Sequence, residues 1–269
     1  MLFMAATPIS PSGAAAPERV VSLNLCVDHY LLAIADRRQI AALTLLATDP
    51  AMSATAAEAR GLPQIRGTAE EVIRLAPDLV LAGGFARRET QALLRRLGYR
   101  IVDVPAADTI EAVRATTRAI AALLGREAQG ERLVAALDDV LAVPPPAAGG
   151  RRALYLQRRG FVDGERSLVS EMMAAAGLRN VAAEIGLEWT ARVDLEIIVT
   201  HRPELLLVDS VAPRLEDDGS YLLRHPALLA AVPRSRWIAM PQMLVHCGGP
   251  TTAAAITHLR AAVAAVSGE

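Results

Sequence analysis

The segment "LEIIVTHRPELLLV" (195–208) matches an earlier segment, "AEEVIRLAPDLVLA" (69–82), and this repetition decides the predicted fold. The two align when Pro77 is set on Pro203. In each copy we expect a helix to end before the proline, which cannot continue it, and a buried strand to begin directly after it. A single helix–Pro–strand pair would mean little, because such pairs are common in α/β proteins. The repetition predicts two similar α/β lobes.

Two further pairs of segments support a duplication. "RVVSL" (19–23) aligns with "RALYL" (152–156), and "RIVDVP" (100–105) aligns with "RWIAMP" (236–241). All three pairs occur in the same order in the two halves of the chain. Three matched landmarks in one order favour a duplicated lobe over coincidence.

Short apolar runs alternate with helical patterns between these landmarks. The runs are typical of strands, and apolar residues at helical spacing indicate helices. Buried strands that alternate with helices form parallel sheets covered on both faces. In the first half we expect strands at 19–24, 39–44, 78–82 and 100–104, and helices at 27–35 and 87–97.

The middle of the chain is predicted to hold two successive helices, 109–124 and 127–143, broken at Gly125. "PPPAAGG" (144–150) ends the second helix, and a strand pattern resumes at 153–157. We therefore predict an α/β fold of two lobes with mainly parallel sheets, joined by a single long helix. The expected divisions are a leader (1–16), an N-terminal lobe (17–125), a spine helix (126–145) and a C-terminal lobe (146–269).

The composition excludes several classes of function. The chain has 269 residues, 52% of them hydrophobic, which is enough to bury a substantial core. Its 28 basic and 29 acidic residues leave a net charge of −1, so we expect no nucleic-acid partner. Aromatic residues make up only 3%, which argues against a stacking surface for single strands. No apolar run reaches the roughly 18 residues that a membrane span needs.

Residues 1–16 have features of the end of an export signal. Ala14-Ala15-Ala16 before Pro17 fits the small-residue pattern of a cleavage site. No basic residue precedes Arg19 and the apolar stretch is short, so we expect the start of the signal to lie upstream. Export predicts a periplasmic location. The alternative is the disordered leader of a cytosolic protein.

Five motifs in fixed order carry a family resemblance: "RVVSLNLCVDHYLLAIAD" (19–36), "GTAEEVIRLAPDLVLAG" (67–83), "FVDGERSLVSEMMAAAG" (161–177), "DLEIIVTHRPELLLVD" (194–209) and "HCGGPTTAAAITHL" (246–259). With the spine helix, they resemble the periplasmic binding proteins that serve ABC importers of cobalamin, ferric siderophores and haem, most closely the cobalamin binders. The resemblance implies two Rossmann-like lobes, a helix that limits hinge motion, and a ligand cleft between the lobes. It implies a binding protein, not an enzyme, without a cofactor of its own. We expect a monomer.

The resemblance also implies a use for the repeat. In the cobalamin binders of this family, a glutamate at the start of the matched helix in each lobe docks onto arginines of the membrane permease dimer. Glu70 and Glu196 occupy those positions. A carboxylate near a helix N-terminus is favoured by the helix dipole, and two of them would match a two-fold partner. The alternative is that both are ordinary first-turn glutamates.

Ligand-binding residues are expected in the segments that leave the carboxyl ends of the strands, where open α/β sheets bind ligands. Arginines are frequent there, with Arg88, Arg159 and Arg192 nearby, which predicts a positive cleft and a ligand with carboxylates or a phosphate. Aromatic residues are candidate apolar walls or, alternatively, part of the core. The candidates are Asn24, Cys26, Arg66, Phe85, Arg87, Arg158, Phe161, Trp189, His246 and Cys247.

The two cysteines leave three alternatives open. Cys26 follows the first strand and Cys247 precedes the last helix, so the resemblance places one on each lobe. An exported protein could join them in a disulfide, although a bond across the hinge would pin the lobes. Burial as small apolar residues is the preferred interpretation. With His29 or His246 they could also supply soft ligands to a metal, and His246 could cap a chelated iron or cobalt.

The main hypothesis is a protein that captures a metal chelate and delivers it to an ABC importer. Corrinoid, ferric siderophore and haem remain open, although the arginines of "QRRGF" (157–161) are unexpected for a cobalamin site. No nucleotide-binding, nucleophile-elbow or metalloprotease motif occurs. The alternative is a cytosolic two-lobed α/β enzyme that acts on an anionic small molecule held by the glycines of "CGGPTT" (247–252).

Overall fold

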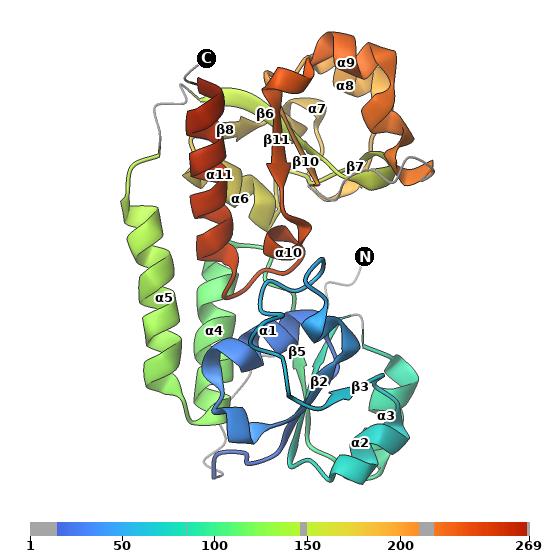
Figure 1. Cartoon of the computed structure of the whole chain (residues 1–269), viewed down its shortest axis with the longest axis vertical. Helices are drawn as coiled ribbons and strands as arrows, with labels where there is room; N and C mark the ends of the chain where they lie inside the picture. The colour runs from blue at the N-terminus through green and yellow to red at the C-terminus, as the bar shows by residue number, and fades with distance from the viewer. Residues whose placement is uncertain (1–14, 85, 146–149, 210–217, 268–269) are drawn as a thin grey trace. The chain divides into compact units, whose positions relative to one another are not determined.

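A computed structural model describes residues 15–84, 86–145, 150–209 and 218–267, and the chain divides into two compact units. Unit 1 comprises the residues up to Ala107, Glu111–Ala136 and His246–Thr251. Unit 2 comprises Asp108–Ile110, Leu137–Val245 and the residues from Thr252 onward. Figure 1 shows the elements of both units. In the described part of the chain, every helix is too short or too polar to cross a bilayer.

Unit 1 contains a five-stranded sheet in the order β3-β2-β1-β4-β5, and every pairing in it is parallel. The central strands are buried apolar runs that match the sequence prediction, because a parallel sheet is covered on both faces. The strands are β1 (Val20–Ser22), β2 (Ile40–Thr44), β3 (Gln64–Ile65), β4 (Leu79–Gly83) and β5 (Ile101–Val104).

Alternate residues of these strands enter two separate cores, as the two-residue period of a strand requires. Leu79 and Leu81 pack in one core with α1 (Leu25–Ile34) and α4 (Ile110–Leu124). Val80 and Ala82 pack in the other core with α2 (Ala69–Leu75) and α3 (Arg88–Arg96). Gly125, with φ +67°, separates α4 from α5 (Glu127–Ala142) at the predicted break.

Unit 2 contains a six-stranded mixed sheet. β11, β10, β6 and β8 are joined by parallel pairings, whereas β7 pairs antiparallel with β6 and with β9. The antiparallel strands were not predicted, because each has only two residues and leaves no periodic signal. The strands are β6 (Arg151–Leu156), β7 (Phe161–Val162), β8 (Leu178–Asn180), β9 (Ala191–Arg192), β10 (Leu205–Asp209) and β11 (Trp237–Met240).

The helices of unit 2 cover its sheet. Ala182 of α7, Ile198 of α8 and Leu228 of α9 lie in one buried cluster with strand residues. α11 packs against α6 and β11. The helices are α6 (Leu168–Ala175), α7 (Ala182–Ile185), α8 (Leu195–His201), α9 (Pro226–Ala231), α10 (Gln242–Val245) and α11 (Thr252–Ser267).

The sequence repeat corresponds to a repeated structure inside each unit. α2 ends at Leu75 and α8 at His201, and the next residue of each, Ala76 or Arg202, adopts a left-handed conformation directly before the proline. The strand pairings share a register: Val80 faces Ile101 in unit 1, and Leu206 faces Trp237 in unit 2. These positions coincide when the prolines and the arginine-led strands are aligned.

A matched arginine ties this element together in both units. Arg19 donates to the carbonyl of Leu75 (2.6 Å), and Arg152 donates to the carbonyl of His201 (2.8 Å). Each carbonyl belongs to the last residue of its helix, and the carbonyls in this last turn accept no hydrogen bond from within the helix. The backbone N–H of each arginine also donates to a matched carboxylate, Asp78 (3.1 Å) or Glu204 (3.2 Å). The structure therefore confirms the predicted α/β architecture with mainly parallel sheets.

Candidate functional site

Asn24 organises the carboxyl edge of the unit 1 sheet. It follows β1, and its Oδ1 accepts hydrogen bonds from the backbone N–H groups of Cys26 (2.8 Å) and Val27 (3.4 Å), which caps α1. Gly83 lies against this side chain: a Cβ on Gly83 would come within 2.6 Å of Asn24. Asn24 is thus at the expected edge, and its carboxamide oxygen is already used to begin a helix.

Cys26 and Cys247 form a disulfide, with their Cα atoms 5.2 Å apart. Both cysteines belong to unit 1, which corrects the expectation of one cysteine on each lobe and the preference for free, buried thiols. Gly249 packs on the ring of Tyr30, and the Tyr30 hydroxyl donates to the Gly248 carbonyl (3.4 Å). The segment 246–251, which the sequence-based divisions placed in the C-terminal lobe, is therefore built into unit 1.

The disulfide also excludes two functional interpretations. Bonded sulfurs are not the thiolates that a metal requires, so Cys26 and Cys247 are not a metal pair in this structure. Among the described residues, no group of three or more His, Cys, Asp or Glu side chains could hold a metal ion. The "CGGPTT" loop is no open phosphate cradle, because Cys247 is bonded, Gly249 is covered by Tyr30 and Thr251 is buried.

Two buried titratable side chains, Asp28 and His29, follow Cys26. Burial raises the pKa of Asp28 from 3.8 to about 6, against hydrogen bonds from Ser22 and Thr44. Burial, with a smaller contribution from His246, lowers the pKa of His29 to about 4. His29 Nε2 lies 3.2 Å from Ser53 Oγ, while Nδ1 has no hydrogen-bond partner among the residues that the structure describes. His246 itself is exposed.

The other candidates of unit 1 also leave strand ends. Arg66 follows β3 and Arg87 precedes α3, and both are exposed. Phe85 lies outside the described residues. Leu45 and Leu46, which were not among the predicted site residues, follow β2 and are 51% and 44% exposed. Local patterning does not reveal that a 3₁₀ turn over Leu45–Thr48 carries both leucines to the surface.

In unit 2, a tight turn at the carboxyl end of β6 brings several candidates together. Arg158 and Arg159 are exposed, and Arg159 (φ +60°) and Gly160 (φ +78°) both take the left-handed conformation. Gln157 N–H donates to the Phe161 carbonyl (2.8 Å), and Val193 N–H donates to the Gly160 carbonyl (2.9 Å). Phe161, 41% exposed, pairs with Arg192 across β7 and β9. The backbone therefore brings three arginine residues and one phenylalanine to one strand end.

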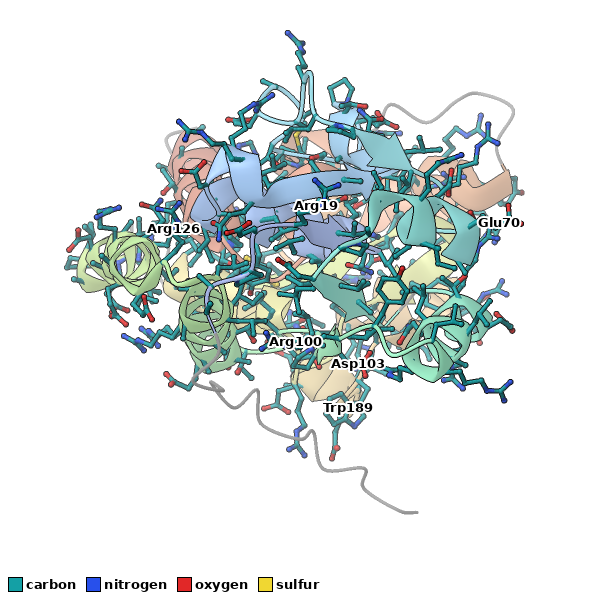
Figure 2. All side chains as sticks on the ribbon, turned by 90° about the horizontal axis from the view of Figure 1, so that it is seen from below. Arg19, Glu70, Arg100, Asp103, Arg126 and Trp189 are labelled. Carbon is teal, nitrogen blue, oxygen red and sulfur yellow. A yellow bond between two sulfur atoms is a disulfide. The ribbon has the colours of Figure 1, made fainter. Side chains whose placement is uncertain are left out.

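Trp189 precedes β9 and is 56% exposed, so it is not part of a lobe core. Its side chain projects from the ribbon in Figure 2. The guanidinium carbon of Arg166 lies 5.2 Å from the ring centroid, within the range of a cation–π contact. Gly164 allows the two segments to approach, because a Cβ there would come within 2.4 Å of the Glu188 carbonyl group.

Glu70 and Glu196 lie in the first turns of α2 and α8, and both are exposed. Figure 2 shows Glu70 on the outer side of its helix. The neighbouring Glu71, not Glu70, serves the helix end: Glu71 Oε2 accepts from the Thr68 N–H (3.1 Å), and the Glu71 N–H donates to Thr68 Oγ1 (3.4 Å). Glu70 therefore has no part in the capping box of α2.

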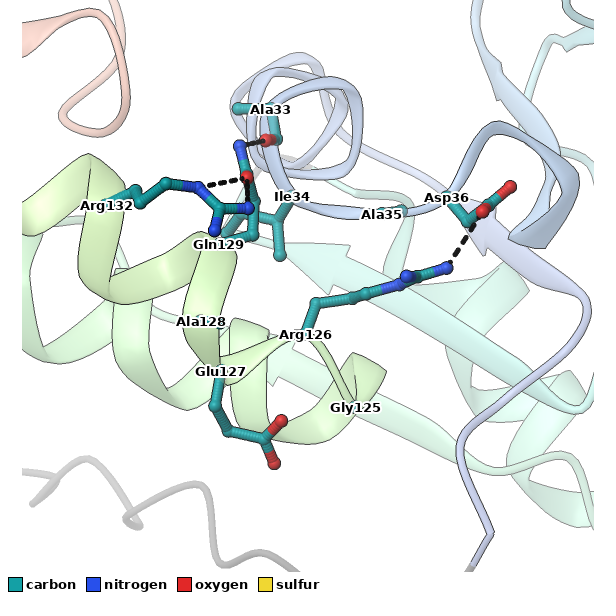
Figure 3. Close-up of a pocket in the computed structure, with 10 residues that line it drawn as sticks. All are labelled: Ala33, Ile34, Ala35, Asp36, Gly125, Arg126, Glu127, Ala128, Gln129 and Arg132. Atoms are coloured by element: carbon teal, nitrogen blue, oxygen red, sulfur yellow. Dashed lines mark hydrogen bonds and ion pairs between the residues drawn. The ribbon is translucent and has the colours of Figure 1, made fainter.

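A separate pocket of about 430 Å³ lies in unit 1 where α1 ends and α5 begins (Figure 3). Arg126 pairs with Asp36 (2.9 Å), and Gln129 donates to the Ala33 carbonyl (2.9 Å). The pocket is at the end of α1 opposite Cys26, about 12 Å away along the helix. Its polar side chains bind one another, and it does not belong to the carboxyl edge.

Two repeated α/β units with exposed arginines near the carboxyl ends of parallel strands fit the class of proteins that bind a small molecule at such strand ends. A family model for periplasmic binding proteins matches residues 20–243, so the chain belongs to the periplasmic binding protein family. The family is one of binding proteins rather than enzymes, and membership implies a periplasmic location. It does not favour the cytosolic alternative.

Individual relatives agree with this assignment. A cobalamin-binding protein of Halobacterium salinarum is 28% identical over 214 residues, which are 77% of this chain and 58% of that protein. The chain thus spans less than two thirds of the curated relatives it matches. The periplasmic haem-binding protein RhuT of Roseiflexus sp. RS-1, in its apo form, is 26% identical with a TM-score of 0.72, covering 93% of this chain and 99% of RhuT.

The vitamin B12-binding protein BtuF of Vibrio cholerae is 17% identical with a TM-score of 0.68, covering 94% of this chain and 99% of that one. At this identity the likeness shows the fold alone.

Proposed function

We propose that this chain captures a metal chelate in the periplasm, a corrinoid such as cobalamin, a ferric siderophore or haem, and delivers it to an ABC importer. The family assignment supports capture and delivery in general. The haem-binding and cobalamin-binding relatives support a chelate as cargo. No bond is made or broken in this function.

The observation that carries the ligand part is the turn at the end of β6. Arg158, Arg159 and Phe161 are exposed there, and Arg192 lies opposite Phe161. Planar guanidinium groups bind carboxylates with paired hydrogen bonds, and an aromatic ring offers an apolar face. Such a set suits a flat or apolar chelate that carries free carboxylates, which favours haem or a carboxylate siderophore over an amide-bearing corrinoid.

The ligand is identified by visible absorption of the purified protein, followed by thermal shifts with haemin, cyanocobalamin, a ferric hydroxamate and ferric citrate. We expect one probe to raise the melting temperature. Replacing Arg158 or Arg87 with alanine should weaken its binding about tenfold, the value of one charge-assisted hydrogen bond. Arg95→Ala, which removes an exposed arginine of α3 that pairs with Asp103, should leave affinity unchanged. If no probe binds, or if neither arginine matters, the proposal of a cationic chelate site fails.

We further propose that Glu70 and Glu196 dock the protein onto arginines of the importer's permease. Three observations support this proposal. Glu70 and Glu196 occupy matching positions in the repeat, both are exposed, and Glu71 rather than Glu70 forms the capping box of α2. Charged rim groups set the rate and orientation of encounter more than ligand affinity.

The test is uptake in cells carrying the cognate importer. The double variant Glu70→Ala/Glu196→Ala should abolish uptake and keep ligand affinity. Glu89→Ala, an exposed first-turn glutamate of α3 outside the repeat, is the matched control and should transport normally. Loss of ligand affinity in the double variant would instead make the two glutamates structural or ligand-facing.

A further inference from the structure

Asp163 in unit 2 is a buried carboxylate at the junction of three chain segments, and only 9% of it is exposed. Gln157 Nε2 donates to its Oδ2 (2.9 Å) and Thr190 Oγ1 donates to its Oδ1 (2.5 Å). Asn180 Nδ2 donates to its backbone carbonyl (3.1 Å). One residue thus joins the end of β6, the end of β8 and the segment before β9.

The donors that Asp163 binds are sequence neighbours of the exposed candidate residues. Gln157 directly precedes Arg158, and Thr190 directly follows Trp189. Backbone hydrogen bonds also join the segment after Asp163 to the segment before Trp189. Glu165 N–H donates to the Leu187 carbonyl and Arg166 N–H to the Glu188 carbonyl, both at 2.9 Å. Holding Gln157 and Thr190 on one carboxylate therefore fixes the spacing between the arginine turn and Trp189.

The electrostatic surroundings of Asp163 indicate that burying a carboxylate at this position costs folding free energy. Burial raises the pKa of Asp163, the bonds from Thr190 and Gln157 oppose this, and the nearby Asp209 carboxylate raises the pKa further. Asp209 in turn accepts a hydrogen bond from the Tyr155 hydroxyl. A buried carboxylate beside a second carboxylate is unfavourable unless its hydrogen bonds hold it there, and a purely apolar core residue would have served packing better.

We propose that Asp163 is a positioning residue for ligand capture, which holds the Arg158–Phe161 turn and the Trp189–Arg192 segment in the geometry that binds the chelate. This inference rests on the proposed function for the identity of the bound molecule. Asp163 does not touch the ligand in this proposal. It acts through Gln157 and Thr190.

The test is hydrogen exchange of the ligand-free protein with a set of matched variants. Asp163→Ala should speed amide exchange about tenfold in both 157–162 and 187–192, since each hydrogen bond to a buried charge is worth about one order of magnitude. Gln157→Leu should affect only the first segment and Thr190→Val only the second. Asp163→Asn, which keeps an acceptor for Gln157 and a donor for Thr190, should restore most of the protection. Asp194→Asn, a similar change at an exposed aspartate that makes no capping hydrogen bond to α8, should do nothing.

Affinity for haemin, or for whichever probe binds the wild type, gives the second measurement. It should fall about tenfold in Asp163→Ala and recover in Asp163→Asn, at a temperature where every variant is folded. Unchanged exchange in both segments, or unchanged affinity in a folded Asp163→Ala protein, overturns the proposal. If Asp163→Ala does not fold, Gln157→Leu and Thr190→Val decide it by the same criteria. If the wild type binds none of the probes, the proposed function is wrong. The hydrogen-exchange pattern still tests whether Asp163 links the two segments.

Discussion

The two units share a scaffold and differ in how they secure their carboxyl edges. In both, an arginine caps the repeated helix and a carboxylate binds the arginine's N–H, through Arg19 and Asp78 in unit 1 and Arg152 and Glu204 in unit 2. Unit 1 fastens its edge covalently, with Cys26 bonded to Cys247. Unit 2 uses hydrogen bonds to the buried Asp163. The two units therefore share the contacts that hold the helix–proline–strand element and differ in the contacts that hold their edges.

Breaking the disulfide should have the largest effect. Its two cysteines are 221 positions apart, and a cross-link over a long loop stabilises by about 2–5 kcal/mol. The variant Cys26→Ala/Cys247→Ala should lose that much of the free energy of unfolding, measured with urea. A reductant should weaken the wild type to the same extent and leave the double variant unaffected. Equal stability of wild type and variant would mean that the covalent fastening of unit 1 contributes nothing.

The next effect concerns pH, because the titrations of two adjacent residues of unit 1, Asp28 and His29, change the free energy of unfolding in opposite directions. Asp28 has a raised pKa in the folded state, so the folded state holds more protons than the unfolded state between pH 3.8 and about 6, and stability falls as pH rises through that range. His29 has a lowered pKa, so the unfolded state holds more protons between about pH 4 and 6.5, and stability rises with pH there. Each contribution is about 3 kcal/mol, since one pKa unit is worth about 1.4 kcal/mol.

The two slopes therefore nearly cancel in the wild type, and single variants should reveal them. Asp28→Asn should leave a protein that becomes more stable from pH 4 to 6.5. His29→Gln should leave one that becomes less stable from pH 4 to 6. Urea unfolding at several pH values measures both. Parallel pH profiles for the two variants would contradict the assignment.

Replacing a glycine with alanine should cost more stability at Gly164, on the edge of unit 2, than at Gly83, on the edge of unit 1. Gly164→Ala meets the backbone of Glu188 at 2.4 Å, which cannot move without shifting Trp189, so we expect a loss of about 1–3 kcal/mol. Gly83→Ala meets the Asn24 side chain, which can rotate away at the cost of an N-cap, about 1 kcal/mol. Gly84→Ala, with no atom within 4 Å, is the control and should stay within about 0.5 kcal/mol. Thermal unfolding ranks the three, and an equal loss at Gly83 and Gly164 would contradict the contrast between the edges.

The matched arginines should show the smallest effects. Arg152 donates to Glu184 as well as to the end of α8, whereas Arg19 donates to the carbonyl of Leu75 at the end of α2. We expect Arg152→Ala to cost about 1–2 kcal/mol and Arg19→Ala about 1 kcal/mol or less. Arg95→Ala removes an exposed pair with Asp103 and should cost about 0–0.5 kcal/mol. If Arg19→Ala lowered the free energy of unfolding as much as Arg152→Ala, the expected difference between the two arginines would be wrong.

Local features were predictable wherever one segment contained the whole signal. The longer strands of unit 1 (β1, β2, β4 and β5), the helices on either side of Gly125 and the prolines that end α2 and α8 all follow from periodicity and backbone chemistry within about fifteen residues, whereas the two-residue β3 was not predicted. The exposure of Leu45 was not predicted, and the sequence left Trp189 open between an exposed wall and the core, because exposure depends on what other segments cover. The role of Asp163 was equally hidden: its three partners lie 6, 17 and 27 positions along the chain.

The amino-acid sequence by itself determined the repeated helix–proline–strand element, the parallel α/β class and the arginine-rich strand ends, since each depends on neighbours along the chain. Only the tertiary structure decided that 246–251 belongs with unit 1, that the cysteines are bonded to each other, and that Asp163 joins two candidate ligand segments. These features depend on contacts between residues far apart in the chain, and such contacts form only once both sheets have fixed where each strand ends.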